Sequence, residues 1–142
     1  MKSGVYILQD TLKIIEISIY YKGAIMKVCR KDTGDTYTPF NHFGMATQVI
    51  FNPETGSKNA NVTLSTIPRG AGSDDEVHDH SDQIFYIIKG EMKVSANGQQ
   101  LEVVRAGDGL LVEAGDVHAV ANDGEEDCVF CCITVPPLDQ TH

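Results

Sequence analysis

Hydrophobic and polar residues alternate with a period of two along most of this chain, a pattern typical of half-buried β-strands. The apolar run IFYII at 84–88 indicates a more deeply buried strand. Asn97-Gly98 separates two alternating segments, and this pair favours a type I′ hairpin turn because both central residues need positive φ. Turn-forming Gly, Asp and Asn separate the remaining segments. The strands predicted from this pattern cover 62–67, 84–88, 91–96, 99–104, 109–113, 118–121 and 128–135.

The first 45 residues have a weaker pattern. Apolar residues alternate over 15–21, which predicts a strand, and a second strand is predicted over 24–30, whereas the composition of 32–44 is that of a loop. Many short, evenly spaced strands indicate an all-β sandwich or barrel. We interpret 1–45 as an N-terminal extension of the same domain, 46–137 as the barrel and 138–142 as a C-terminal tail. A strand-rich extension can cover an exposed sheet edge of a partner, so we expect a homodimer.

Charge narrows the range of partners. The chain has 142 residues and a mass of 15.5 kDa, which suits one domain, and its 20 acidic against 11 basic residues give a net charge of -9. Such a chain repels phosphate backbones and anionic lipid, so we expect no nucleic-acid partner and no membrane partner. No apolar run is long enough to span a bilayer, and the first residues lack a signal-peptide pattern. We therefore expect a cytoplasmic protein.

Three of the four cysteines lie in one apolar run, CVFCCITV at 128–135, and Cys29 stands alone. The CxxC pair Cys128 and Cys131 is compatible with half a zinc site or a redox pair, but no second pair accompanies it. Burial in a strand is the favoured interpretation, because cysteine is among the most buried residue types.

Two blocks of residues carry the candidate chemistry. His78 and His80 are two residues apart, so on an extended segment both imidazoles point to the same face and can bind one metal ion. The first block is Gly72, His78, His80, Gln83 and Gly90, and the second is Gly107, Glu113, Gly115, His118 and Asn122.

These blocks resemble the paired motifs of the cupin superfamily, which are Gly, His-x-His, a carboxylate and Gly, then a hairpin, then Gly, Pro, Gly, His and Asn. Gln83 occupies the place of the usual Glu after a shorter spacing, and Glu113 that of the usual Pro. The resemblance implies an all-β fold, a small cupin barrel (a double-stranded, jelly-roll-like β-helix) with an N-terminal strand-rich extension. It also implies that His78, His80 and His118 bind a metal, with Gln83 as a candidate fourth ligand.

Three imidazoles suit one divalent transition metal ion, which could be Fe, Mn, Zn, Ni, Co or Cu. A neutral Gln83 would leave that ion less neutralised than a Glu would, favouring an anionic or enolate-like small molecule. Gln83 is equally well interpreted as a hydrogen-bonding neighbour of the ligands. We interpret His42 as a packing or lid residue. The acidic residues beside the motif are interpreted as a solvated loop, and they are Asp74, Asp75, Glu76, Asp79 and Asp82.

Three functions remain open at this point. The first is a metal-dependent enzyme, either a dioxygenase or an isomerase or lyase, although Gln83 cannot serve as the carboxylate of such a mechanism. The second is a module that binds a small molecule or a metal without catalysis. The third is a degenerate barrel that serves only for oligomerisation. The catalytic residues stay unknown in all three.

Overall fold

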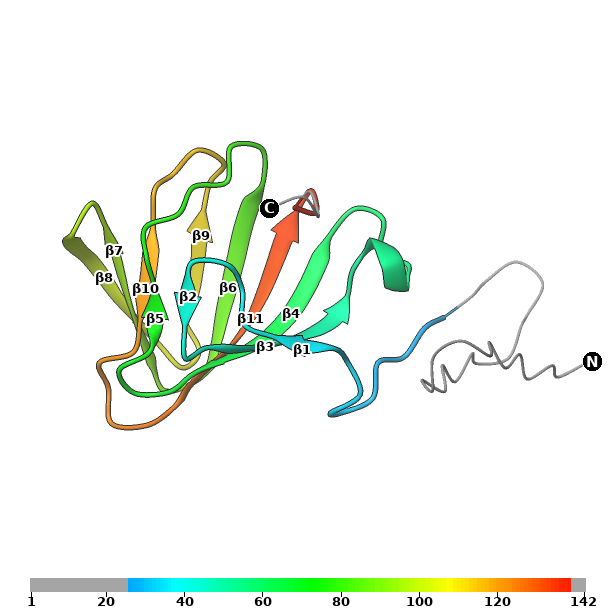
Figure 1. The fold of residues 1–142 in the computed structure, drawn as a ribbon, viewed down its shortest axis with the longest axis horizontal. Helices are drawn as coiled ribbons and strands as arrows, with labels where there is room; N and C mark the ends of the chain where they lie inside the picture. The colour runs from blue at the N-terminus through cyan, green and yellow to red at the C-terminus, as the bar shows by residue number, and fades with distance from the viewer. Residues whose placement is uncertain (1–25, 139–142) are drawn as a thin grey trace, which may run out of the picture.

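The computed structural model describes residues 26–138, which form two antiparallel β-sheets (Figure 1). The six-stranded sheet has the order β1-β3-β4-β11-β6-β9, and the five-stranded sheet has the order β2-β5-β10-β7-β8. The first sheet comprises β1 (Thr36–Tyr37), β3 (Ala46–Phe51), β4 (Asn61–Ile67), β11 (Cys128–Val135), β6 (Asp82–Lys89) and β9 (Gly109–Val112). The second comprises β2 (His42–Phe43), β5 (Gly72–Ser73), β10 (Ala119–Ala121), β7 (Glu91–Ala96) and β8 (Gln99–Arg105).

The expected all-β barrel fold is confirmed, and the strands predicted after residue 60 are present with small shifts of their ends. Asn97 and Gly98 join β7 to β8 with φ of 52° and 77°, the positive values that the predicted hairpin turn requires. In the part of the chain that the structure describes, helical structure is limited to η1 (Pro53–Thr55), whose N-terminus is capped by Asn52.

The region before residue 60 departs from the sequence-based expectations. The segment 32–44, expected as a loop, contains β1 and β2, which are two residues each and too short to show a period. β1 pairs with the longer strand β3, and β2 pairs with β5, which also has two residues. The predicted strand 24–30 is wrong for its described part, because 26–30 pairs with no strand. The predicted strand 15–21 lies outside the described residues.

The core lies between the two sheets and combines side chains from both. Phe85 of β6 and Phe130 of β11 pack with ring centroids 5.6 Å apart, and Met92 of β7 faces them from the second sheet. Strand parity places Phe85 and Ile87 on the inner face with Gln83, while Tyr86 points outward and is 54% exposed. The two sheets therefore form one hydrophobic core, which positions the inner-facing residues of β6.

The cysteine-rich run forms β11, as the sequence indicated. Cys128 and Cys132 face the core, whereas Cys131 lies on the opposite face of the strand. Burial raises the pKa of Cys128 to about 11 and, despite a hydrogen bond from Thr134, that of Cys132 to about 12. Both thiols are therefore protonated at neutral pH.

This burial predicts selective thiol chemistry. In the folded protein at pH 8, Cys128 and Cys132 should resist alkylation, because the thiolate is the reactive form and both side chains are inaccessible. Denaturant should make them react as fast as a free cysteine. Mass spectrometry after timed alkylation measures this, with the partly exposed Cys29 as the internal reference. Rapid labelling of Cys132 in folded protein would contradict the packing of β11.

Candidate metal centre

The centre is organised by a backbone bridge between two segments that are far apart in sequence. Glu76 and His118 form an isolated antiparallel β-bridge, in which each N–H donates to the other residue's carbonyl at 2.8 and 2.9 Å. This pairing fixes the segment before the His-x-His motif beside the start of β10. It brings the Glu76 carboxylate toward the inner-facing side chains of β6.

Three imidazoles surround one carboxylate oxygen of Glu76. The distance from Oε1 is 3.5 Å to Nε2 of His118, 3.6 Å to Nε2 of His42 and 3.8 Å to Nε2 of His78. The side chains are largely removed from solvent, with exposed fractions of 4% for His118, 8% for His42 and 15% for Glu76. Water therefore screens these contacts weakly.

Hydrogen bonds fix which nitrogen of His118 carries a proton. Its Nδ1 lies 3.2 Å from the carbonyl oxygen of Asp116, which can only accept, so Nδ1–H is the donor. Its Nε2 lies 3.0 Å from Oε1 of Gln83 and 3.5 Å from Oε1 of Glu76, which both accept. A protonated ring therefore donates Nε2–H to them, and a neutral ring offers the Nε2 lone pair as a metal ligand.

The amide nitrogen of Gln83 is hydrogen-bonded on the side away from the cluster, and this orients the amide oxygen toward the cluster. Its Nε2 donates to the hydroxyl of Thr134 on the neighbouring strand at 3.4 Å, which directs Oε1 toward His118. The side chain is 8% exposed. Gln83 thus contributes a buried carbonyl oxygen beside the imidazole.

His78 adds another unpaired donor atom. Its Nε2 is buried and has no hydrogen-bond partner among the described residues, and its ring lies 5.6 Å from that of His118. An unpaired buried polar atom is costly unless a further group satisfies it. The Nε2 atoms of His78 and His118 and the Oε1 of Glu76 therefore form a compact group of potential metal ligands.

In the metal-free cluster, the electrostatics favour contact between an ionised carboxylate and the imidazoles. Burial alone would raise the pKa of Glu76, but its contacts with His118, His78 and His42 outweigh it, so the pKa falls to about 2. Burial would likewise lower the pKa of His118, but the contact with Glu76 and the Asp116 carbonyl raises it overall. Glu76 is therefore an ionised carboxylate at neutral pH.

The donor atoms of Glu76, His78 and His118 lie within 4.8 Å of one another, which is compatible with one shared metal ion. Two donors of a tetrahedral ion with bonds of about 2.1 Å lie about 3.4 Å apart. The distances from Glu76 Oε1 to Nε2 of His118 and His78, 3.5 and 3.8 Å, need only small adjustments to reach that geometry. The residues present therefore fit a divalent transition metal.

The structure brings together some of the predicted ligands. His78, His118 and Gln83 lie around the same point, whereas His80 lies in an exposed turn and is not part of the cluster. Glu76 was assigned to a solvated acidic loop, but it is the carboxylate of the centre. The sequence did indicate that Glu76 could lie on the same face as His78, because the two residues share strand parity just as the two motif histidines do.

His42 was expected to be a packing or lid residue, and the structure places it against Glu76. Its Nδ1 lies 2.7 Å from the carbonyl oxygen of Phe40, so Nδ1–H donates to it and the ring is held with Nε2 toward the carboxylate. His42 is not among the three residues whose donor atoms are mutually within 4.8 Å. It contacts Glu76 from the β2 side of the centre.

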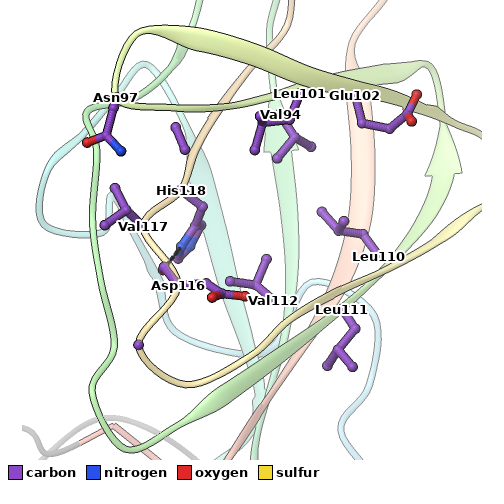
Figure 2. A pocket seen from close by; sticks show the side chains of 12 residues that line it. Val94, Asn97, Leu101, Glu102, Leu110, Leu111, Val112, Asp116, Val117 and His118 are labelled. Carbon is purple, nitrogen blue, oxygen red and sulfur yellow. Dashed lines mark hydrogen bonds between the residues drawn. The ribbon is translucent and has the colours of Figure 1, made fainter.

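A cavity of about 470 Å³ opens beside His118. In Figure 2, Val94 and Leu101 of the β7–β8 hairpin line one side, and Leu110 and Val112 of β9 line the other. The lining also includes the acidic residues Glu102 and Asp116, but no lysine or arginine. The lining of the cavity is thus mostly apolar with two acidic residues, and it includes His118 of the centre.

A small two-sheet β-barrel with a buried His/Glu cluster at one end defines the class of this protein. The model of the cupin-domain family matches residues 63–134, and the chain belongs to this family. The match runs from within β4 to within β11, and it includes His78, His118 and Gln83. No curated protein matches the chain.

Solved structures share the fold at low sequence identity. A predicted oxalate decarboxylase from Thermotoga maritima is 22% identical with a TM-score of 0.66, and covers 79% of this chain and 100% of its own. KdgF from a Halomonas species is 18% identical with a TM-score of 0.66, covering 82% and 100%. The polyketide cyclase RemF from Streptomyces resistomycificus is 15% identical with a TM-score of 0.68, covering 83% and 87%. These likenesses show the fold alone.

Among the described residues, no helix has the length and apolar character needed to cross a membrane.

Proposed function

We propose that this cupin binds one divalent transition metal through His78, His118 and Glu76, and holds a small molecule beside it. The observation that carries the proposal is the convergence of buried acceptor atoms. The Nε2 of His78 has no hydrogen-bond partner among the described residues, and it lies within 4.8 Å of both the Nε2 of His118 and the Oε1 of Glu76. A cation at that point satisfies all three at once.

Gln83 supports this centre as a weaker oxygen ligand or as a hydrogen-bonding neighbour of a ligand. Its fixed amide places a carbonyl oxygen 3.0 Å from Nε2 of His118, which is close enough for either role. Glu76 supplies the negative charge that the motif lacks at position 83. A site with one carboxylate leaves a divalent ion at a net charge near +1, rather than the +2 expected with neutral ligands only.

The cavity supports a largely apolar ligand. Its walls carry Val94, Leu110 and Val112, and its acidic residues Glu102 and Asp116 disfavour a ligand with several negative charges. An anionic or enolate-like group remains suitable only where it contacts the metal directly. We therefore propose a small molecule with an apolar body and one metal-binding oxygen.

A divalent ion with few protein ligands keeps coordination positions open and acts as a Lewis acid toward a bound molecule. In this chain, Glu76 is an ionised carboxylate that would hold the ion with His78 and His118, and His42 contacts it from outside the group of metal donors. This arrangement supports an isomerase or lyase, and equally a dioxygenase. The similar structures carry different names, a decarboxylase, a cyclase and KdgF, so the fold does not choose among them.

The assignment of ligands predicts different results for the two motif histidines. His78→Ala should lower the affinity for Zn²⁺ or Co²⁺ at least tenfold, because His78 points into the cluster. His80→Ala, the matched control, should change it less than threefold, because His80 lies in an exposed turn. Isothermal titration of chelator-treated protein measures both affinities, and elemental analysis of the purified protein identifies the natural metal.

Equal losses in the two variants would restore His80 as a ligand and keep the metal-binding function. Wild-type protein that binds none of the six candidate metals would overturn the function itself. In that case, a non-catalytic module that binds a small molecule, or an oligomerisation barrel, would be the remaining proposals. Where metal binding is confirmed, oxygen uptake in a substrate screen separates a dioxygenase from an isomerase or lyase.

A further inference from the structure

The cavity beside the metal centre has negative charges that no cationic side chain of its lining neutralises. The lining contains the carboxylates of Asp116 and Glu102, but no lysine or arginine. Within residues 26–138, the Asp116 carboxylate forms no hydrogen bond and no salt bridge, and Glu102 accepts only the backbone N–H of Val103. Both acidic residues are exposed, so water solvates them while the cavity is empty. A ligand that fills the cavity displaces part of this water and must replace its contacts.

Asp116 is the carboxylate closer to the candidate metal ligands. Asp116 and His118 are two positions apart, so their Cα atoms are separated by at most about 7 Å. Figure 2 shows Asp116 beside His118 and Val112, whereas Glu102 lies on the β7–β8 side of the cavity. The backbone carbonyl of Asp116 orients the His118 ring at 3.2 Å, which leaves the side chain of Asp116 available for another contact.

The cavity and the metal centre together have two poles of opposite charge. A divalent ion held by a single carboxylate, that of Glu76, keeps a net positive charge at the inner pole. Asp116 and Glu102 form the negative pole, and apolar side chains make up most of the lining. A ligand with an electron-rich oxygen, a hydrocarbon body and a cationic group is complementary to all three parts. An anionic ligand without a cationic group is complementary to the metal alone.

We propose that the ligand of this site is a small amine, whose ammonium group contacts the Asp116 carboxylate while its oxygen binds the metal. The ammonium group supplies the hydrogen-bond donors that Asp116 loses when water leaves the cavity. Glu102 adds a second negative charge from the other side of the cavity. The short separation of Asp116 and His118 limits the ligand to about one ring with a short arm. This inference rests on the proposed function and adds the chemical class of the ligand.

Three probes that share a phenol oxygen and an apolar ring test this class. Tyramine carries an ammonium group, para-ethylphenol carries no charge on its side chain, and para-hydroxyphenylpropionate carries a carboxylate. Isothermal titration of Zn²⁺-loaded protein should give at least tenfold tighter binding of tyramine than of para-ethylphenol, and the weakest binding for the propionate. Equal affinities for tyramine and para-ethylphenol, or no binding of any probe, would overturn the proposal.

Asp116→Asn tests the residue that makes the contact. The substitution keeps the shape of the side chain and the backbone carbonyl that orients His118. Tyramine affinity should fall at least fivefold, whereas para-ethylphenol affinity should change less than twofold. Glu113→Gln is the matched control, because Glu113 is exposed in the same loop and does not line the cavity. Equal losses of tyramine affinity in both variants would indicate general attraction to an acidic chain and would overturn the contact.

Titration of the same samples with Zn²⁺ separates this inference from the proposed function. Wild-type protein that binds Zn²⁺ but does not prefer tyramine contradicts the ligand class alone. Wild-type protein that binds no Zn²⁺ contradicts the metal centre, whereas tyramine binding to it that is lost in Asp116→Asn would still support the Asp116 contact. Asp116→Asn protein should bind Zn²⁺ within threefold of wild type. A large loss of Zn²⁺ would assign Asp116 to the metal centre and overturn its role in ligand recognition.

Discussion

Glu76→Gln should reduce the metal affinity of this protein by about a hundredfold or more. The substitution preserves the shape of the side chain and its place in the β-bridge with His118, but it removes the negative charge of the cluster. The amide also offers a weaker oxygen donor than a carboxylate, because its oxygen carries less charge. Competition titration against a chelator of known affinity measures the change.

Asp74→Asn is the matched control for this experiment. Asp74 belongs to the same acidic run and is exposed, so its substitution also removes one negative charge from the same loop. A general electrostatic attraction of cations to the loop would weaken equally in both variants. A direct ligand predicts a large effect for Glu76 and a change of less than threefold for Asp74. Equal effects would show that Glu76 does not bind the metal.

The candidate site was only partly predictable from sequence, and the reason is the local backbone. Two of the residues that the motif spacing selected, His78 and His118, lie together in the structure, and the parity of β6 places Gln83 on the inner face with Phe85. The turn at 79 and 80 takes His80 away from the cluster, whereas extended backbone around Glu76 points its carboxylate inward. A His-x-His pattern implies a shared face only where the chain is extended.

The fold was better predicted where hydrogen-bonded ladders are long. β4, β7, β8 and β11 were predicted within one residue at each end, because alternation over six or more positions gives a clear period. β1, β2 and β5 have two residues each, and only their partners make them strands. The same limit explains why the contact of His42 with Glu76 was not predicted. His42 lies on β2, in a segment whose composition is that of a loop.

Asn122→Ala should destabilise the folded protein by about 3 kcal/mol, the largest loss of stability expected from a single polar side chain here. Asn122 is fully buried at the end of β10, and its amide nitrogen donates to the carbonyls of Ile67 and Glu126, both at 2.8 Å. Its side-chain oxygen accepts from the N–H of Gly124 at 2.9 Å. Alanine would remove this partner from all three backbone groups, of which the carbonyl of Ile67 is buried and the other two are partly buried. Denaturant unfolding followed by circular dichroism measures the loss.

Asn122→Asp should be more destabilising than Asn122→Ala at neutral pH, although aspartate has almost the same shape. A carboxylate has no N–H for the carbonyls of Ile67 and Glu126, so it places acceptors against acceptors and adds a buried charge. Asn59→Ala, at an exposed asparagine, should change stability by less than about 0.5 kcal/mol. An aspartate variant as stable as wild type would show that Asn122 does not cross-link β4 to the loop before β11. Asn122, the last residue of the second motif, would then need a role in the site rather than in the fold.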